Sequence, residues 1–83
     1  MDRRSIGLSD ADGVTLRGLE LIGELVHEGR RQAGITQRHL AKHADVNQST
    51  ISRLERGRLN GMRLKRLAVI LATLEWLASR QRR

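Results

Sequence analysis

Residues 36–57 read TQRHLAKHADVNQSTISRLERG and predict two short helices joined by a tight turn. Thr36 is suited to cap the first helix, since its hydroxyl can accept a backbone N–H from the first turn. Leu40, Ala41 and Ala44 follow at helical spacing and make one apolar stripe. The first helix of the pair therefore has a defined start and a side that faces inward.

The turn is predicted at residues 44–47, where Val46 is apolar enough to fill the corner and Asn47 is suited to cap the second helix. The second helix is predicted at residues 48–56, with its two large apolar residues on the inward side. Gly57 ends it, because glycine adopts the left-handed conformation without steric cost. Two such short helices cannot bury enough apolar surface alone, so they must pack on neighbouring helices.

The outward face of the second helix is polar and cationic, as in helices that enter the DNA major groove. Gln48 can pair with adenine and Arg53 with guanine through two hydrogen bonds each. Ser49 and Thr50 can contact bases or phosphates, Thr50 through its methyl or hydroxyl group. Alternatively, Ser49, Thr50 and Ser52 simply make this face soluble. The residues expected to contact bases are Gln48, Ser49, Thr50 and Arg53. Those expected to contact phosphates are Gln37, Lys42, Ser52, Arg56 and Arg58.

This pattern resembles the helix-turn-helix signature of lambda-repressor-like (Xre/Cro-type) DNA-binding domains. The resemblance extends from about Ile22 to Leu77. It implies a compact all-α domain of four or five helices. The positions that carry it are Thr36, Gln37, Leu40, Ala41, Ala44, Val46, Ile51, Ser52, Glu55 and Gly57.

The resemblance also implies roles for three individual residues. In the family, the residue matching Gln37 holds a DNA phosphate at the N-terminus of its helix, where backbone N–H groups are free. An arginine and a glutamate at the positions of Arg30 and Glu55 form an internal ion pair in the family. We therefore expect Arg30 to pair with Glu55 and to tie the first helix to the recognition helix.

Length and composition limit the class of protein. A chain of 83 residues allows one domain with one small core. The absence of cysteine excludes disulfides and thiolate metal sites. The longest apolar run, residues 67–72, is too short to cross a membrane, and no apolar signal region follows the N-terminal arginines. These features predict a soluble cytoplasmic protein.

Charge is distributed unevenly along the chain. The 16 Lys and Arg residues and 9 Asp and Glu residues give a net charge of +7. Residues 1–29 carry three basic and six acidic side chains, whereas residues 30–83 carry thirteen basic and three acidic ones. The positive field therefore belongs to the helix-turn-helix and the segment after it, which favours a polyanionic partner.

A helix is predicted before the helix-turn-helix, from Thr15 to Ala33, and Gly34 is expected to end it. Its inward stripe consists of Leu19, Ile22, Val26 and Ala33, with Leu25 at the edge. Gly18, Gly23 and Gly29 each lower its helix propensity by roughly 1 kcal/mol relative to alanine. Packing must therefore hold this helix together.

A second long helical segment is predicted from Met62 to about Arg80, as one helix or as two with a bend near Thr73. One apolar face consists of Leu64, Leu67, Ala68, Leu71, Leu74 and Ala78, and a second of Val69, Ile70, Trp76 and Leu77. Two apolar faces exceed the needs of one small core. We therefore expect a homodimer interface built on Ile70, Trp76 and Leu77. The alternative is that Trp76 only packs on the helix predicted at residues 15–33.

The chain is divided into three parts. Residues 1–13 are expected to be a flexible N-terminal arm, residues 14–79 the helix-turn-helix DNA-binding domain, and residues 80–83 a basic tail. Arg3 and Arg4 of the arm could touch DNA or simply belong to a mobile terminus. The tail could lie along DNA or remain solvated.

Other functions find little support in the residues. The i, i+4 pair His39 and His43 has no third ligand, so no metal site is predicted. No enzyme activity, cofactor or small-molecule ligand is expected, because no catalytic constellation or phosphate-binding glycine loop is present. RNA binding is disfavoured because Trp76 is the only aromatic residue among Phe, Trp and Tyr.

The sequence thus predicts a sequence-specific regulator of the repressor type that binds double-stranded DNA. Its recognition helix would span Gln48 to Arg56. The alternative is a protein-binding helix-turn-helix module, such as an antitoxin or a transcriptional bridging factor, because domains of the family also serve in this way.

Overall fold

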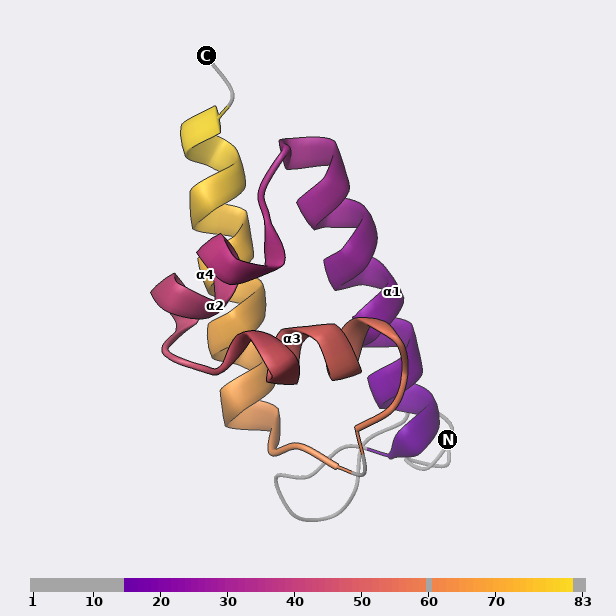
Figure 1. Cartoon of the computed structure of the whole chain (residues 1–83). Coiled ribbons are helices and arrows are strands. Elements are labelled where there is room, and N and C mark those ends of the chain that lie inside the picture. The colour runs from indigo at the N-terminus through magenta and orange to yellow at the C-terminus, as the bar shows by residue number, and fades with distance from the viewer. Residues whose placement is uncertain (1–14, 60, 82–83) are drawn as a thin grey trace, which may run out of the picture.

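Four helices make up the part of the chain that the computed structural model describes, residues 15–59 and 61–81. Figure 1 shows α1 and α4 side by side and running in the same direction, with α3 lying across them. The expected all-α helix-turn-helix fold is confirmed. In this part of the chain, no helix combines the length and the apolar character needed to cross a bilayer. The helices are α1 (Leu16–Ala33), α2 (Gln37–Ala44), α3 (Gln48–Glu55) and α4 (Leu64–Gln81).

Side-chain caps define the starts of the first two helices. The Thr15 hydroxyl accepts a hydrogen bond from the Gly18 N–H at 3.1 Å, and the Thr36 hydroxyl accepts one from the His39 N–H at 3.0 Å. Asn47 occupies the N-cap position of α3, as predicted, but its side chain makes no capping hydrogen bond. Its carbonyl oxygen accepts from the first turn of α3 instead.

Left-handed residues end α1, α2 and the turn after α3. Gly34 has φ 71° and Gly57 has φ 68°, which confirms both predicted glycine stops. Asp45 ends α2 with φ 59°, the one positive value at a non-glycine position among the described residues. A short polar side chain tolerates this conformation better than most, so the turn between α2 and α3 forms without glycine.

The core lies where α1 and α2 each pack against both α3 and α4. The predicted stripe of α1 is confirmed, with Leu19 and Val26 buried and Ile22 and Ala33 half-buried, whereas Leu25 is exposed. The buried core residues are Leu19, Val26, Ile35, Leu40, Ala41, Ala44, Ile51, Leu54, Leu67, Ile70, Leu74 and Leu77.

The segment after α3 forms one continuous helix, α4, but its inward face differs from the prediction. Leu67, Ile70, Leu74 and Leu77 are buried because their 3-4-3 spacing places them on one stripe. Ile70 and Leu77 therefore belong to the core of the single chain. The sequence had instead suggested that they anchor a second copy, but their burial leaves them unavailable for that contact. Trp76, the third expected anchor, is 51% exposed.

Gly23 marks the closest approach of α1 to α3. A Cβ atom at this position would overlap the carbonyl oxygen of Leu54 and lie 3.0 Å from its carbonyl carbon. Both are backbone atoms, so any side chain here would force the two helices apart. From the sequence, Gly23 was expected only to weaken its helix, whereas the structure gives it a packing role.

The remaining predicted parts fall outside the described residues. They are the arm at residues 1–13 with Arg3 and Arg4, Asn60 of the loop before α4, and Arg82 and Arg83 of the tail.

Candidate nucleic-acid interface

The outer face of α3 gathers most of the residues that were predicted to contact DNA. Gln48, Ser49, Ser52, Arg53 and Arg56 together line one shallow hollow on this face. All of them are exposed except Ser52, which is half-buried. Donors and acceptors for base edges therefore share one surface with two guanidinium groups.

Thr50 is separate from this group. It is half-buried and lines a different hollow, together with the α2–α3 turn and Met62 and Arg66 of the α4 side. Arg66 also donates to the Asp45 carbonyl oxygen at 3.5 Å, which links α4 to the turn. Thr50, which was predicted to contact bases, therefore lies apart from the hollow that holds Gln48, Ser49 and Arg53.

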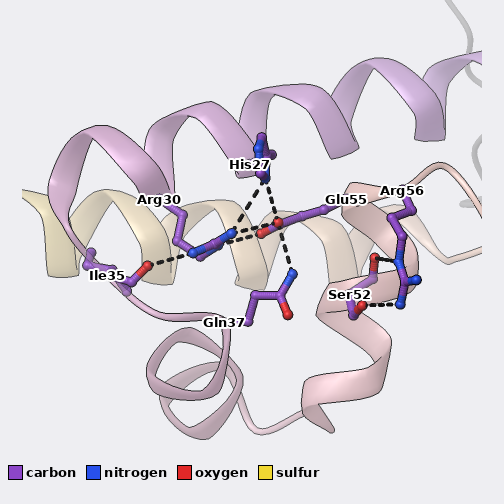
Figure 2. A network of polar contacts seen from close by, with 7 residues as sticks. All are labelled: His27, Arg30, Ile35, Gln37, Ser52, Glu55 and Arg56. Carbon is purple, nitrogen blue, oxygen red and sulfur yellow. Dashed lines mark hydrogen bonds and ion pairs between the residues drawn. The ribbon is translucent and has the colours of Figure 1, made fainter.

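Arg56 is held along the surface of α3 by a neighbouring serine. Figure 2 shows its guanidinium donating to both the carbonyl oxygen and the hydroxyl oxygen of Ser52, one turn earlier. The Ser52 hydroxyl accepts in this contact, so its own hydrogen is still available for donation. This arrangement presents a guanidinium and a hydroxyl side by side.

The other predicted phosphate contacts come from outside α3. Lys42 on α2 and Arg58 after α3 are both exposed, whereas Gln37 in the first turn of α2 is half-buried. His39 and His43 lie side by side on α2, with ring centroids 4.6 Å apart and ring planes tilted by 41°. The described residues contain no group of three or more His, Cys, Asp or Glu side chains arranged to hold a metal ion.

Arg30 and Glu55 form the ion pair expected from the family resemblance, and Figure 2 shows them facing each other between α1 and α3. Arg30 Nε donates to Glu55 Oε2 at 2.7 Å, and Arg30 Nη2 donates to Oε1 at 3.0 Å. Two parallel bonds of this kind are the strong form of arginine–carboxylate recognition. The Glu55 side chain is 3% exposed and that of Arg30 15%, so the pair is largely shielded from water.

Glu55 also accepts hydrogen bonds from two residues that the sequence did not predict to contact it. His27 Nδ1 donates to Oε1 at 2.9 Å from α1, and Gln37 Nε2 donates to the same oxygen at 3.1 Å from α2. Arg30 Nη1 in addition donates to the Ile35 carbonyl at 3.0 Å. The end of α3 is thus tied to α1, to the α1–α2 connection and to α2 (Figure 2).

A sequence signal for part of this network existed. His27 precedes Arg30 by three residues, which places both on one face of α1. Once Arg30 was expected to pair with Glu55, a contact between His27 and Glu55 could therefore also have been predicted. The bond from Gln37 was not, because it depends on how α2 is placed against the end of α3.

The pKa of Glu55 lies below its ordinary value as the result of opposing effects. Burial alone raises the pKa, but hydrogen bonds from Arg30, His27 and Gln37, together with the charge of Arg30, outweigh it. The pKa of Arg30 is raised by its hydrogen bond to Glu55, against the effect of burial. Both shifts favour the charged forms, so the pair is ionised at neutral pH.

Acid should therefore weaken the fold through Glu55. A carboxyl group with a lowered pKa contributes stability above its unfolded pKa of about 4.3, and this contribution is lost as the pH falls through the folded pKa. We expect the free energy of unfolding to decrease between about pH 5 and pH 2, and Glu55→Gln to remove part of this decrease. Urea titrations across this range test it, and equal slopes against pH for both proteins would contradict it.

Comparison with known proteins agrees with this geometry. A family model described as a helix-turn-helix domain matches residues 21–80, a range that includes all of α2 and α3 and most of α1 and α4. No curated protein matches the chain. The match covers most of the chain and fits the resemblance to lambda-repressor-like domains. The chain therefore belongs to the helix-turn-helix domain family.

Proposed function

We propose that this protein is a sequence-specific transcriptional regulator of the repressor type that binds double-stranded DNA. The observation that carries the proposal is the exposed hollow of α3, where Gln48, Ser49 and Arg53 stand beside Arg56 in a helix-turn-helix fold. A helix of this kind fits the major groove, where amide and guanidinium groups distinguish adenine and guanine. Its chemistry is binding rather than catalysis.

Backbone phosphates are contacted by the cationic and polar residues around α3, namely Gln37, Lys42, Ser52, Arg56 and Arg58. The amide of Gln37 donates one hydrogen to Glu55, and its second N–H is available to a phosphate together with the free backbone N–H groups of the first turn of α2. Contacts of this type fix the register of the protein on the duplex without reading sequence.

The regulator acts in the cytoplasm as a homodimer about a two-fold axis. With Ile70 and Leu77 buried, the exposed Trp76 is the expected anchor on α4 that remains available to such a dimer. A two-fold dimer reads an inverted repeat whose half-sites lie about 34–36 Å apart.

Selection of bound sequences from a random duplex pool tests the proposal directly. Enrichment of a defined motif, arranged as an inverted repeat, is the expected result. If no motif is enriched, sequence-specific regulation is excluded. The alternative function, a protein-binding module such as an antitoxin or a bridging factor, is then favoured.

Arg53 should carry sequence discrimination, whereas Lys42 should not. Arg53→Ala is expected to cost about 1–3 kcal/mol on the selected site and to relax preference at one base pair, because a paired contact to guanine is lost. Lys42→Ala, the control on α2, should weaken binding to all sequences equally. Fluorescence anisotropy with single-base variants of the site measures both. An equal loss on every sequence for Arg53→Ala would assign it to phosphate.

Binding should depend strongly on salt, because thirteen basic residues follow position 29. If roughly six phosphates are neutralised per dimer, log K should fall with log salt concentration with a slope near 5 in magnitude. Titrations at several salt concentrations measure the slope. A binding constant that barely changes with salt would argue against DNA as the ligand.

A further inference from the structure

The outward side of α1 carries an apolar and acidic surface, whereas the residues after position 29 are mainly basic. Leu21 is 45% exposed and Leu25 65% exposed, one turn apart on this helix. Glu24 follows Leu21 by three residues, and Glu28 follows Leu25 by three, so the four side chains are neighbours on the helix surface and form one patch. We call these residues, Leu21, Glu24, Leu25 and Glu28, the acidic leucine face.

The first turns of α4 carry a surface of the complementary kind. Met62 and Val69 provide an apolar floor, and Val69 is 45% exposed. Arg63, Lys65 and Arg66 surround this floor, and all three are exposed. We call these five residues, Met62, Arg63, Lys65, Arg66 and Val69, the basic hollow.

We propose that the acidic leucine face of one copy binds the basic hollow of a second copy. Two exposed leucines match an exposed apolar floor, and the carboxylates beside the leucines match the cations around the floor. Within residues 15–59 and 61–81, neither Glu24 nor Glu28 forms an ion pair, since Glu28 is bonded only to the amide of Gln32. Their charges are therefore available to a partner.

The contact is head to tail, because the two surfaces share no residue and lie on different helices. Such a heterologous contact leaves one free surface of each kind at the ends and can add further copies. Neither surface includes a residue of α3, although Glu24 lines a hollow with Arg56, and Met62 and Arg66 line one with Thr50. The head-to-tail contact goes beyond the proposed function, which requires only a two-fold dimer.

Self-association driven by opposite charges should be weak and sensitive to salt, because both surfaces are small and exposed. It should also need the leucines, which distinguishes docking from a diffuse attraction between charges. Leu25→Ala is therefore expected to weaken it while the charges remain unchanged.

Two charge-reversal variants test the proposal without DNA. Variant A carries Glu24→Lys and Glu28→Lys, and variant B carries Lys65→Glu and Arg66→Glu. Sedimentation velocity over a concentration series at low salt should show that each variant self-associates at least about tenfold more weakly than the wild type. An equimolar mixture should regain association, because variant A keeps an intact basic hollow and variant B an intact acidic leucine face.

Two controls distinguish the loss of docking from unfolding and from a general change of charge. Thermal unfolding followed by circular dichroism verifies that both variants are folded, and Glu75→Lys changes the charge outside both surfaces. A two-fold dimer through Trp76 would contribute equally to each variant and to the mixture, so it cannot produce the gain on mixing. No gain on mixing, or a wild type that does not associate beyond the level of variant A, would overturn the head-to-tail contact. Neither result would affect the DNA-binding proposal.

Discussion

Arg30→Ala is expected to lower the free energy of unfolding by about 3–5 kcal/mol, because it leaves a buried carboxylate without its cation. Glu55 is 3% exposed and would keep only the hydrogen bonds from His27 and Gln37. Glu55→Ala should cost less, because the longer Arg30 side chain, already 15% exposed, can turn toward water. For a domain of about 5–8 kcal/mol in total, either loss is a large fraction.

Urea titrations of both single variants and of the double variant measure the coupling between the two residues. A cycle with a coupling energy well above about 1 kcal/mol is expected, since two charge-assisted hydrogen bonds join the two side chains. Arg31→Ala is the matched control, because Arg31 is adjacent on α1 but exposed, and its loss should change stability by less than about 0.5 kcal/mol. Additive effects of Arg30→Ala and Glu55→Ala would mean that the pair does not hold α3 against α1.

Gly23→Ala is expected to destabilise the protein by about 3 kcal/mol or more, although alanine is the better helix former by about 1 kcal/mol. The added methyl group would overlap the Leu54 carbonyl oxygen, and a backbone atom cannot move aside as a side chain can. The displacement would also pull Glu55 away from His27 and Arg30, so the packing and the polar network are lost together.

Gly29→Ala is the control on the same helix. A Cβ atom at Gly29 would lie 3.1 Å from Leu74 Cδ2, the end of a side chain that can adjust. We expect its stability to remain within about 1 kcal/mol of the wild type, because the gain in helix propensity offsets the tighter contact. Thermal unfolding of both variants under one buffer condition measures the difference. Equal effects at the two positions would show that propensity, and not the approach of α3, governs this helix.

Local features of the fold were predictable because their causes lie within a few residues. The threonine caps of α1 and α2 and the glycine stops at Gly34 and Gly57 depend on hydrogen bonds and backbone angles of the adjacent turn. The inward residues of the two short helices followed from helical periodicity. The left-handed Asp45 was not predicted, although a short polar side chain tolerates this conformation better than most.

The candidate site was predictable to a different degree for each of its parts. The outward residues of α3 follow from its apolar side, so Gln48, Ser49 and Arg53 were assigned from the sequence and remain proposed DNA contacts. Thr50 lies apart from them because the tertiary structure places it beside the α2–α3 turn and Met62. The ion pair of Arg30 and Glu55 was expected only through the family resemblance, because no local rule joins residues 25 positions apart.

The threonine caps, the glycine stops and the inward sides of α1, α2 and α3 follow from the amino-acid sequence alone, because those properties arise from neighbouring residues. Three further features depend on the packed domain: Ile70 and Leu77 belong to the core, Gly23 is required for close contact, and Glu55 accepts bonds from α1 and α2 at once. Burial and polar pairing between helices depend on how the helices are placed relative to one another. Each helix of this small domain reaches that placement only when its neighbours are present.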